Sequence, residues 1–304
     1  MAQSLNMKIL VTGSSGFIGR HLTEFLKNKG ITVLPYDQKT DPQDDILDFQ
    51  RLKDRIKEAD GAVHLAAITR PRSAFEAPKD CVKINIGGTA NVLEALRLAS
   101  LAQGRRPWLI FISSRDVFGE PKTLPLTEEA PKNPQNLYGL TKAAGEEMCR
   151  IFSESYGLKT RVLRFTSVYG AALDDSDRVI PKFIIQAAKN EPLTILGTGQ
   201  EIFDFTHVSD IVEGIWQCIG ELAHTPKAYD DFLLSYGRPV FLKDLAETII
   251  RETKSKSKIV FQEARQFSTV KSYANPEKAR KILGFNPKIN INEGIKLLVQ
   301  QLKS

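Results

Sequence analysis

The sequence predicts an α/β protein in which a doubly wound parallel sheet is followed by a smaller, mixed α/β region. Three observations lead to this fold class. Short apolar runs alternate with amphipathic stretches from Lys8 to Ser114, as expected for parallel strands joined by helices. Three glycines stand between the first apolar run and the first amphipathic stretch. Beyond Tyr169 this alternation stops, and glycine and proline become frequent.

The first half of the chain contains the expected elements of the sheet. The run KILVT at 8–12 is a buried strand, and apolar residues then recur at helical spacing from Ile18 to Leu26. Gly30 follows at the position of a helix C-cap. We predict further strands at 31–36, 62–67, 109–114 and 160–165, and helices at 89–99 and from Leu137 to about Tyr156.

A boundary between two domains is expected near residue 168. Residues 1–168 form the first domain and 169–304 the second, with part of about 204–222 returning to the first. The chain is expected to close with a short helix at 276–283, a GFNP turn and a final helix.

Composition is that of a soluble globular protein. Of 304 residues, 42% are apolar and 26% charged, and no apolar run is long enough to cross a membrane. No signal peptide is visible at the start, so we expect a cytoplasmic protein. The three cysteines are widely spaced, which predicts reduced thiols and no metal site. The net charge of +6 is dispersed and accompanies no nucleic-acid-binding motif, so we expect no nucleic-acid partner.

The glycine-rich turn TGSSGFIG at 12–19 predicts a dinucleotide site. Gly13 permits a tight turn, Gly16 lets the backbone approach a pyrophosphate, and Gly19 lets helix and strand pack closely. Asp37 follows the second strand, 37 − 19 = 18 residues past the last glycine. A carboxylate there accepts hydrogen bonds from the adenosine ribose and repels a 2′-phosphate, which favours NAD over NADP. Alternatively, Asp37 caps the following loop.

A serine, a tyrosine and a lysine form the candidate catalytic group. Tyr138 and Lys142 are four residues apart at the start of a helix, so their side chains project from one face. A nearby ammonium and a cationic nicotinamide lower the pKa of a phenol, which makes it a base for alcohol oxidation. Ser114 ends a predicted strand, where its hydroxyl reaches the same substrate oxygen. The spacing alone is weak, because Tyr and Lys are common on amphipathic helices.

A series of motifs in order resembles one known family. The series is TGSSGFIG (12–19), HLAA (64–67), Asn85 with GGT (87–89), SSRDVFG (113–119), YGLTK (138–142), RFTSVYG (164–170) and GTGQEIFDFTHVSD (197–210). Together they resemble the extended short-chain dehydrogenase/reductase family, in its sugar-nucleotide epimerase/dehydratase branch of UDP-glucose 4-epimerase-like enzymes. The likeness covers nearly the whole chain.

The resemblance implies a Rossmann-type NAD-binding domain over 1–168 and a substrate-binding domain over 169–304. It implies that Ser114, Tyr138 and Lys142 are catalytic, and that Lys142 also holds the nicotinamide ribose. Further NAD contacts are implied for a set of residues from the turn and the strand ends: Gly13, Ser15, Gly16, Phe17, Ile18, Gly19, Asp37, Asp45, Ile46, Leu65, Ala66, Ala67 and Asn85. The implied substrate is a nucleoside-diphosphate sugar, and the implied assembly is a homodimer packed through helices.

Two departures from the family pattern concern the substrate. Ser167 stands where an Asn commonly contacts the sugar nucleotide, and Phe203 replaces an Arg that commonly holds a phosphate. Arg265 aligns with the family's second phosphate-binding Arg. Because one cationic contact is missing, the diphosphate is expected to be held differently, with Lys182, Arg70 or Arg72 as substitutes, or the substrate is not a sugar nucleotide.

The residues after Ser114 bear on the type of reaction. Dehydratases of this branch place an acid and a base carboxylate there, whereas this chain has Arg115 and Asp116. An arginine is no general acid at ordinary pH, so dehydration is weakened, although Asp116 remains a possible base. Its alternative role is to cap the turn before Gly119.

The leading hypothesis is therefore an NAD-dependent 4-epimerase that works through a transient 4-keto sugar. The alternatives are a 4,6-dehydratase, a keto-sugar reductase or sugar dehydrogenase with net redox change, and a protein that keeps the fold without chemistry.

Overall fold

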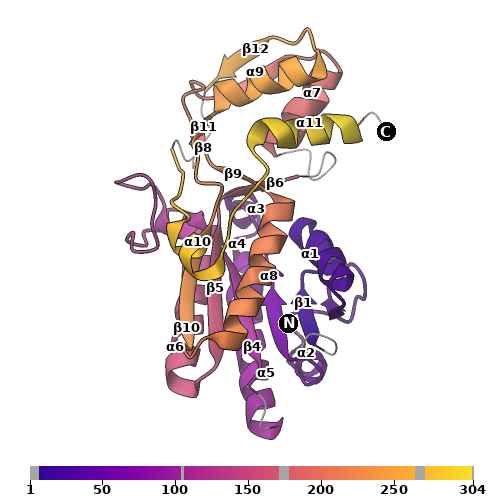
Figure 1. Ribbon diagram of the computed structural model, residues 1–304, viewed down its shortest axis with the longest axis vertical. Coiled ribbons are helices and arrows are strands. Elements are labelled where there is room, and N and C mark those ends of the chain that lie inside the picture. The colour runs from indigo at the N-terminus through magenta and orange to yellow at the C-terminus, as the bar shows by residue number, and fades with distance from the viewer. Residues whose placement is uncertain (1–6, 104–105, 171–177, 264–270, 303–304) are drawn as a thin grey trace.

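A six-stranded parallel sheet forms the centre of the molecule (Figure 1). The computed structural model describes residues 7–103, 106–170, 178–263 and 271–302. The sheet has the strand order β10-β5-β4-β3-β1-β2, and every neighbouring pair is parallel. Its strands are β1 (Lys8–Thr12), β2 (Thr32–Tyr36), β3 (Gly61–His64), β4 (Trp108–Ser114), β5 (Lys159–Phe165) and β10 (Tyr229–Leu234). The doubly wound parallel sheet predicted from the sequence is confirmed.

Helices cover both faces of this sheet because its strands are apolar on both sides. On β1, Ile9 and Val11 belong to one hydrophobic core, and Leu10 belongs to the other. The first core lies under α1 (Phe17–Asn28) and α8 (Val208–His224). The second lies under α2 (Phe49–Ile56), α5 (Gly88–Gln103) and α6 (Leu137–Tyr156). Shorter helical segments, which join β3 to α5 and follow β4, are α3 (Pro71–Glu76), α4 (Pro78–Val82), the π-helical turn Lys83–Gly87 and the 3₁₀ turn Arg115–Phe118.

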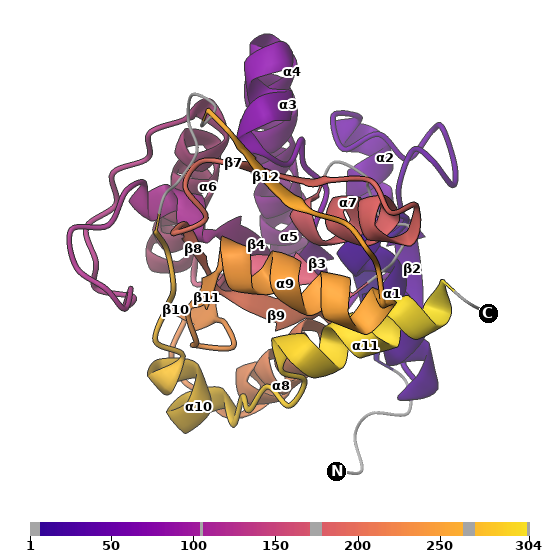
Figure 2. The same ribbon diagram turned by 90° about the horizontal axis from the view of Figure 1, so that it is seen from above.

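A smaller group of elements packs around a third core beyond the carboxyl ends of the strands (Figures 1 and 2). Its helices are α7 (Val179–Ala188), α9 (Leu242–Thr253) and α11 (Ile291–Gln301). Three two-stranded pairs accompany them: β6 (Ser167–Tyr169) with β9 (Phe205–His207), β8 (Ile202–Phe203) with β11 (Val240–Phe241), and β7 (Leu193–Leu196) with β12 (Ile259–Gln262).

The second half of the chain returns to the sheet more than once. Helix α8 packs on α1, as the sequence suggested for about 204–222. Strand β10 is the sixth strand of the sheet, and α10 (Glu277–Leu283) packs on α8 and β10. From the sequence, neither of these two segments is assigned to the first domain. The boundary near residue 168 therefore stays a prediction about folding units. In the part of the chain that the structure describes, the helices are all too short or too polar to cross a membrane.

Candidate active site

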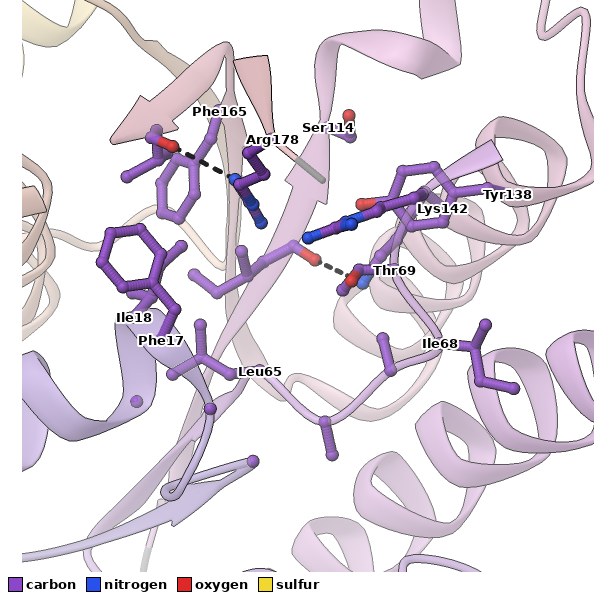
Figure 3. A pocket seen from close by; sticks show the side chains of 18 of the residues that line it. Phe17, Ile18, Leu65, Ile68, Thr69, Ser114, Tyr138, Lys142, Phe165 and Arg178 are labelled. Atoms are coloured by element: carbon purple, nitrogen blue, oxygen red, sulfur yellow. Dashed lines mark hydrogen bonds between the residues drawn. The ribbon is translucent and has the colours of Figure 1, made fainter. Parts of the chain in front are cut away.

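A deep cleft opens where the strand order reverses. Strand β1 lies between β2 and β3, and ligands of doubly wound sheets bind at such a point, beyond the carboxyl ends of the strands. The cleft has a volume of about 1040 Å³ and runs from the glycine-rich turn to the carboxyl end of β4 and to α7 (Figure 3). This volume is at the upper end of what small-molecule sites offer, which suits two ligands side by side.

The glycine-rich turn leaves the start of α1 open to an anion. Gly13 adopts a φ of +69°, and a Cβ added to it would lie 2.7 Å from the backbone nitrogen of Ala66. A Cβ on Gly19 would lie 2.1 Å from the carbonyl oxygen of Gly13. Helix α1 begins at Phe17 with no side-chain cap and no acidic residue in its first turn. Its free N–H groups therefore face the cleft, an arrangement that fits the pyrophosphate of a dinucleotide.

Asp37 stands beside this turn at the end of β2. Its Oδ2 accepts a hydrogen bond from the Ser15 backbone N–H at 2.9 Å, and its Oδ1 accepts one from the Lys39 backbone N–H at 2.9 Å. A carboxylate has further lone pairs, so these contacts orient Asp37 and leave room for a ribose hydroxyl. Ser15 itself is outside the set of residues that line the cleft, and its hydroxyl pairs with Thr40.

The candidate catalytic side chains meet in the cleft (Figure 3). Tyr138 and Lys142 lie one turn apart near the start of α6, which the Asn136 side chain caps. The Lys142 ammonium lies 6.0 Å from the centre of the Tyr138 ring and donates to the carbonyl oxygen of Ile112 at 2.8 Å. Ser114, at the end of β4, lies near Tyr138 and lowers the pKa of its phenol. All three catalytic candidates are at most 9% exposed.

Burial acts on the two titratable groups in opposite directions. It raises the pKa of the Tyr138 phenol, and the Asp116 carboxylate raises it further, whereas Ser114 and Arg178 lower it. Burial lowers the pKa of the Lys142 ammonium to about 8, although Cys81 and Glu146 oppose this shift. The chain by itself therefore holds the phenol protonated, and positive charge from a bound nicotinamide is needed to make it a base at neutral pH.

Asp116 faces its own neighbours. It forms an ion pair with Arg115 at 3.2 Å, and the Ser114 hydroxyl donates to its Oδ2 at 3.1 Å. The Asp116 N–H in turn donates to the Ser114 hydroxyl oxygen at 3.2 Å, so that Ser114 caps the 3₁₀ turn. These contacts give Asp116 a structural role beside the site, although it also lines the cleft.

The predicted cofactor residues divide into two groups. The cleft is lined by Gly13, Gly16, Phe17, Ile18, Gly19, Asp37, Asp45, Ile46, Leu65, Ala66 and Ala67. Asn85 is buried behind this lining rather than in it. Its side chain bonds both backbone groups of Ile68 and the Thr141 hydroxyl. Asn85 therefore supports the cleft wall and α6.

The predicted substrate residues are only partly brought together. Ser167 and Phe203 line the far end of the cleft, and the Phe203 ring stacks on Phe205 at 5.7 Å. Of the proposed cationic substitutes, Arg70 lines the cleft. Lys182 of α7 is not among the lining residues, and Arg72 is exposed and paired with Glu76. Lys182 and Arg72 therefore stay predictions, and Arg265 lies outside the described residues.

Sequence reasoning did not single out Arg178, whose guanidinium lies in the cleft. Arg178 precedes α7 and extends between Phe17 and the catalytic side chains (Figure 3). Its guanidinium lies 5.7 Å from the Phe17 ring centre and donates to the Val168 carbonyl oxygen at 3.1 Å. Its buried Nε has no hydrogen-bond partner within the described residues. No motif or spacing marks this arginine in the sequence.

Comparisons with known proteins agree with this site. Residues 9–230 match the model of the NAD dependent epimerase/dehydratase family. A putative UDP-glucose 4-epimerase of Methanocaldococcus jannaschii is 30% identical, over 97% of this chain and 98% of that protein. The structure of a UDP-glucose 4-epimerase from Thermotoga maritima with UDP-glucose is similar at a TM-score of 0.89 and 26% identity, over 98% and 99% of the two chains.

A third similar protein has been solved with a UDP-sugar and NAD bound together. A UDP-glucuronic acid 4-epimerase from Bacillus cereus, solved with UDP-glucuronic acid and NAD, matches at a TM-score of 0.84 and 25% identity, over 97% of this chain and all of that one. The chain described here belongs to the NAD-dependent epimerase/dehydratase family, and it is an enzyme that uses NAD.

Proposed function

We propose that this enzyme is a UDP-sugar 4-epimerase, which inverts the C4 hydroxyl of a UDP-bound hexose or hexuronate. The observation that carries the proposal is the convergence of Ser114, Tyr138 and Lys142 at the nicotinamide end of a dinucleotide cleft. Relatives named as UDP-glucose and UDP-glucuronate 4-epimerases support the substrate class.

The geometry assigns a task to each catalytic side chain. Tyr138 takes the proton of the C4 hydroxyl, and Ser114 holds the same oxygen through its own hydroxyl. Lys142, as an ammonium, stabilises the phenolate and holds the nicotinamide ribose. Bound NAD supplies the hydride acceptor and a positive charge beside the phenol. The 4-keto sugar then turns in the cleft, and return of the hydride and the Tyr138 proton on its other face completes the inversion without net redox change.

Arg178 is the cation that we assign to the sugar diphosphate. Phe203 stands where the family pattern has a cation, whereas Arg178 places a guanidinium in the same cleft. Among the described residues the buried Nε–H of Arg178 has no partner, so it gains a strong contact when a phosphate oxygen arrives. The position of Asp116 weighs against dehydration, because its carboxylate is engaged by Arg115 and by the Ser114 hydroxyl.

The proposed enzyme is a cytoplasmic homodimer. The helices α5 and α6 lie against each other and expose large apolar side chains, including Leu101, Leu140 and Ile151. Such a face suits a second copy of the chain, since a two-fold axis places the same patch opposite itself. Light scattering that gives the mass of a single chain contradicts this assembly.

Product analysis tests the proposed activity. The purified enzyme is incubated with UDP-glucose and with UDP-glucuronate, and the products are identified by NMR. We expect a mixture of the two C4 epimers and no accumulation of NADH. The control is Tyr138→Phe, which we expect to lower turnover by about 10²- to 10⁴-fold while NAD stays bound. A 4-keto-6-deoxy product, a stoichiometric change in NADH, or no conversion of any UDP-, dTDP-, GDP- or CDP-sugar contradicts the proposal.

A further inference from the structure

A buried carboxylate continues the line of catalytic side chains along α6. Glu146 follows Lys142 by four residues, as Lys142 follows Tyr138, so the three side chains leave the same face of the helix. Glu146 is fully buried. A carboxylate that is completely removed from water lowers stability unless its charge and its lone pairs are satisfied, so its partners need an explanation.

Each of these three side chains contacts a different residue at the end of β4. Tyr138 lies beside Ser114, which lowers the pKa of its phenol, and Lys142 donates to the carbonyl oxygen of Ile112 at 2.8 Å. Glu146 accepts from the Ser113 hydroxyl at 2.6 Å. Two consecutive strand residues, Ile112 and Ser113, are thus hydrogen-bonded to two successive turns of α6, and Ser114 follows them beside Tyr138. The hydrogen bond between Glu146 and Ser113 involves none of the catalytic side chains, so it can be changed without altering the reacting groups.

A network of charges holds Glu146 in this position. Arg164 on β5 donates Nε to one carboxylate oxygen and Nη2 to the other, each at 2.8 Å. Lys132 adds an ion pair at 2.7 Å from the loop before α6. Arg164 also pairs with Asp231 on β10 at 2.6 Å. A bidentate arginine fixes both the position and the orientation of a carboxylate. Glu146 therefore holds α6 at a defined position on the sheet.

We propose that Glu146, anchored by Arg164, is a positioning residue that sets α6 on β4 and thereby places the Tyr138 phenol against Ser114. This inference rests on the proposed epimerase function. A displacement of about 1 Å in a proton-transfer site lowers rates by as much as about 100-fold. Substrate binding depends on other walls of the cleft, so the expected loss is in kcat rather than in KM.

A second buried ion pair on the same strand is a matched control. Arg161 on β5 is also fully buried and donates to Glu221 of α8 with Nε at 2.8 Å and Nη2 at 3.1 Å. It lies three residues before Arg164, and successive side chains alternate between faces, so it points to the opposite side of the sheet. Glu221→Gln therefore has the same chemistry as Glu146→Gln without any contact to α6.

The experiment compares kinetics and structures of three variants with the wild-type enzyme. For Glu146→Gln we expect kcat for UDP-sugar epimerisation to fall by about 10- to 100-fold with KM within about twofold. Ser113→Ala removes the hydroxyl that donates to Glu146 and leaves the charges of Glu146 and Arg164 paired, and we expect kcat to fall by about 5- to 10-fold, on the same positional argument. Glu221→Gln is expected to lose a similar amount of thermal stability and to keep kcat within about twofold of wild type, because its pair is remote from the site.

A crystal structure of Ser113→Ala keeps the test independent of activity. We expect the distance between the Ser114 and Tyr138 hydroxyl oxygens to lengthen by about 0.5 Å, the tolerance within which catalytic groups must be held. An unchanged distance with an unchanged kcat overturns the inference, as does an equal loss of kcat in Glu221→Gln and Glu146→Gln. If Glu146→Gln does not fold, Ser113→Ala decides alone. If wild type converts no UDP-sugar, the proposed function fails, and the distance still tests the positioning role.

Discussion

The two sides of the cleft are built in different ways. The centre of the cofactor side is one continuous segment, in which β1, the glycine-rich turn and the start of α1 present backbone groups, and residues such as Asp37, Asp45 and Leu65 add to it from later segments. The substrate side combines side chains from distant segments, such as Ser114, Arg178 and Phe203, with Leu298 of α11. Backbone recognition tolerates few substitutions because a single Cβ blocks it, whereas side-chain recognition is replaced one residue at a time. The cofactor is therefore fixed by the fold, and the substrate is set by individual residues.

The largest effect is expected for Gly13→Ala, which adds one methyl group to the cofactor side and lowers NAD affinity. In Gly13→Ala the new Cβ meets the backbone of Leu65 and Ala66 within 3.0 Å, at a φ of +69°. Overpacking and a left-handed backbone together destabilise this turn by several kcal/mol, so we expect NAD affinity to fall by about 100-fold or more. Isothermal titration with NAD measures the effect.

Gly30→Ala is the matched control for this substitution. Its φ is +78°, but a Cβ there meets nothing within 4 Å. We expect a loss of about 1–2 kcal/mol in the free energy of unfolding and unchanged NAD affinity. Equal losses of NAD affinity in the two variants contradict the view that close backbone approach makes Gly13 necessary.

A smaller effect is expected when the substrate side loses its cation. In Arg178→Met the side chain keeps much of its apolar length and loses its charge. A hydrogen bond to a charged group contributes about 1.5–3 kcal/mol, so we expect KM for a UDP-sugar to rise by about 10- to 100-fold while NAD affinity is unchanged. Steady-state kinetics together with NAD titration measure the two sides separately. If NAD affinity falls and KM does not, Arg178 belongs to the cofactor side and the assignment is wrong.

The smallest expected effect is a dependence on pH that comes from Lys142. Its pKa is lowered by burial to about 8, so the ammonium is complete below that value and is lost as pH rises through it. We therefore expect kcat to fall by about fivefold between pH 8 and pH 9, as for a single proton of that pKa. The contribution of Lys142 to the free energy of unfolding rises over the same pH interval, in contrast to kcat. The reason is that above pH 8 the unfolded chain still binds this proton, whereas the folded chain has released it. A constant kcat across this interval contradicts the role of the ammonium.

The site residues that could be predicted from the sequence are those that belong to short-range patterns along the chain. The glycine-rich turn, Asp37 and the spacing of Tyr138 and Lys142 are short-range patterns, and the structure brings these residues to one cleft. Arg178 could not be found in this way, because it reaches the cleft from a segment 36 residues past Lys142 and no spacing relates the two. The sequence alone does not show which face of α7 lines the cleft, and Lys182 on that helix is not among the lining residues.

One strand was missed for an electrostatic reason. Strand β10 contains Asp230 and Asp231, which interrupt its apolar run and make it look like a loop. In the folded chain Lys278 pairs with both carboxylates, at 2.8 and 2.9 Å, and Arg164 pairs with Asp231. The partners come from segments about 50 and 65 residues away, so their compensation is invisible in the local pattern. Glu146 could have been predicted from the sequence as a residue on the same helix face, because it continues the four-residue spacing of Tyr138 and Lys142.

Isotope exchange at C4 tests the central claim most directly. In the proposed mechanism the C4 hydrogen leaves as a hydride and returns from the same bound cofactor, while only the hydroxyl proton passes through Tyr138. Epimerisation carried out in D₂O and analysed by mass spectrometry should therefore give a C4 epimer without deuterium on carbon. Deuterium at C4 of the product would mean that a proton is exchanged there instead, and would contradict the assignment of Ser114, Tyr138 and Lys142 to a hydride-transfer site.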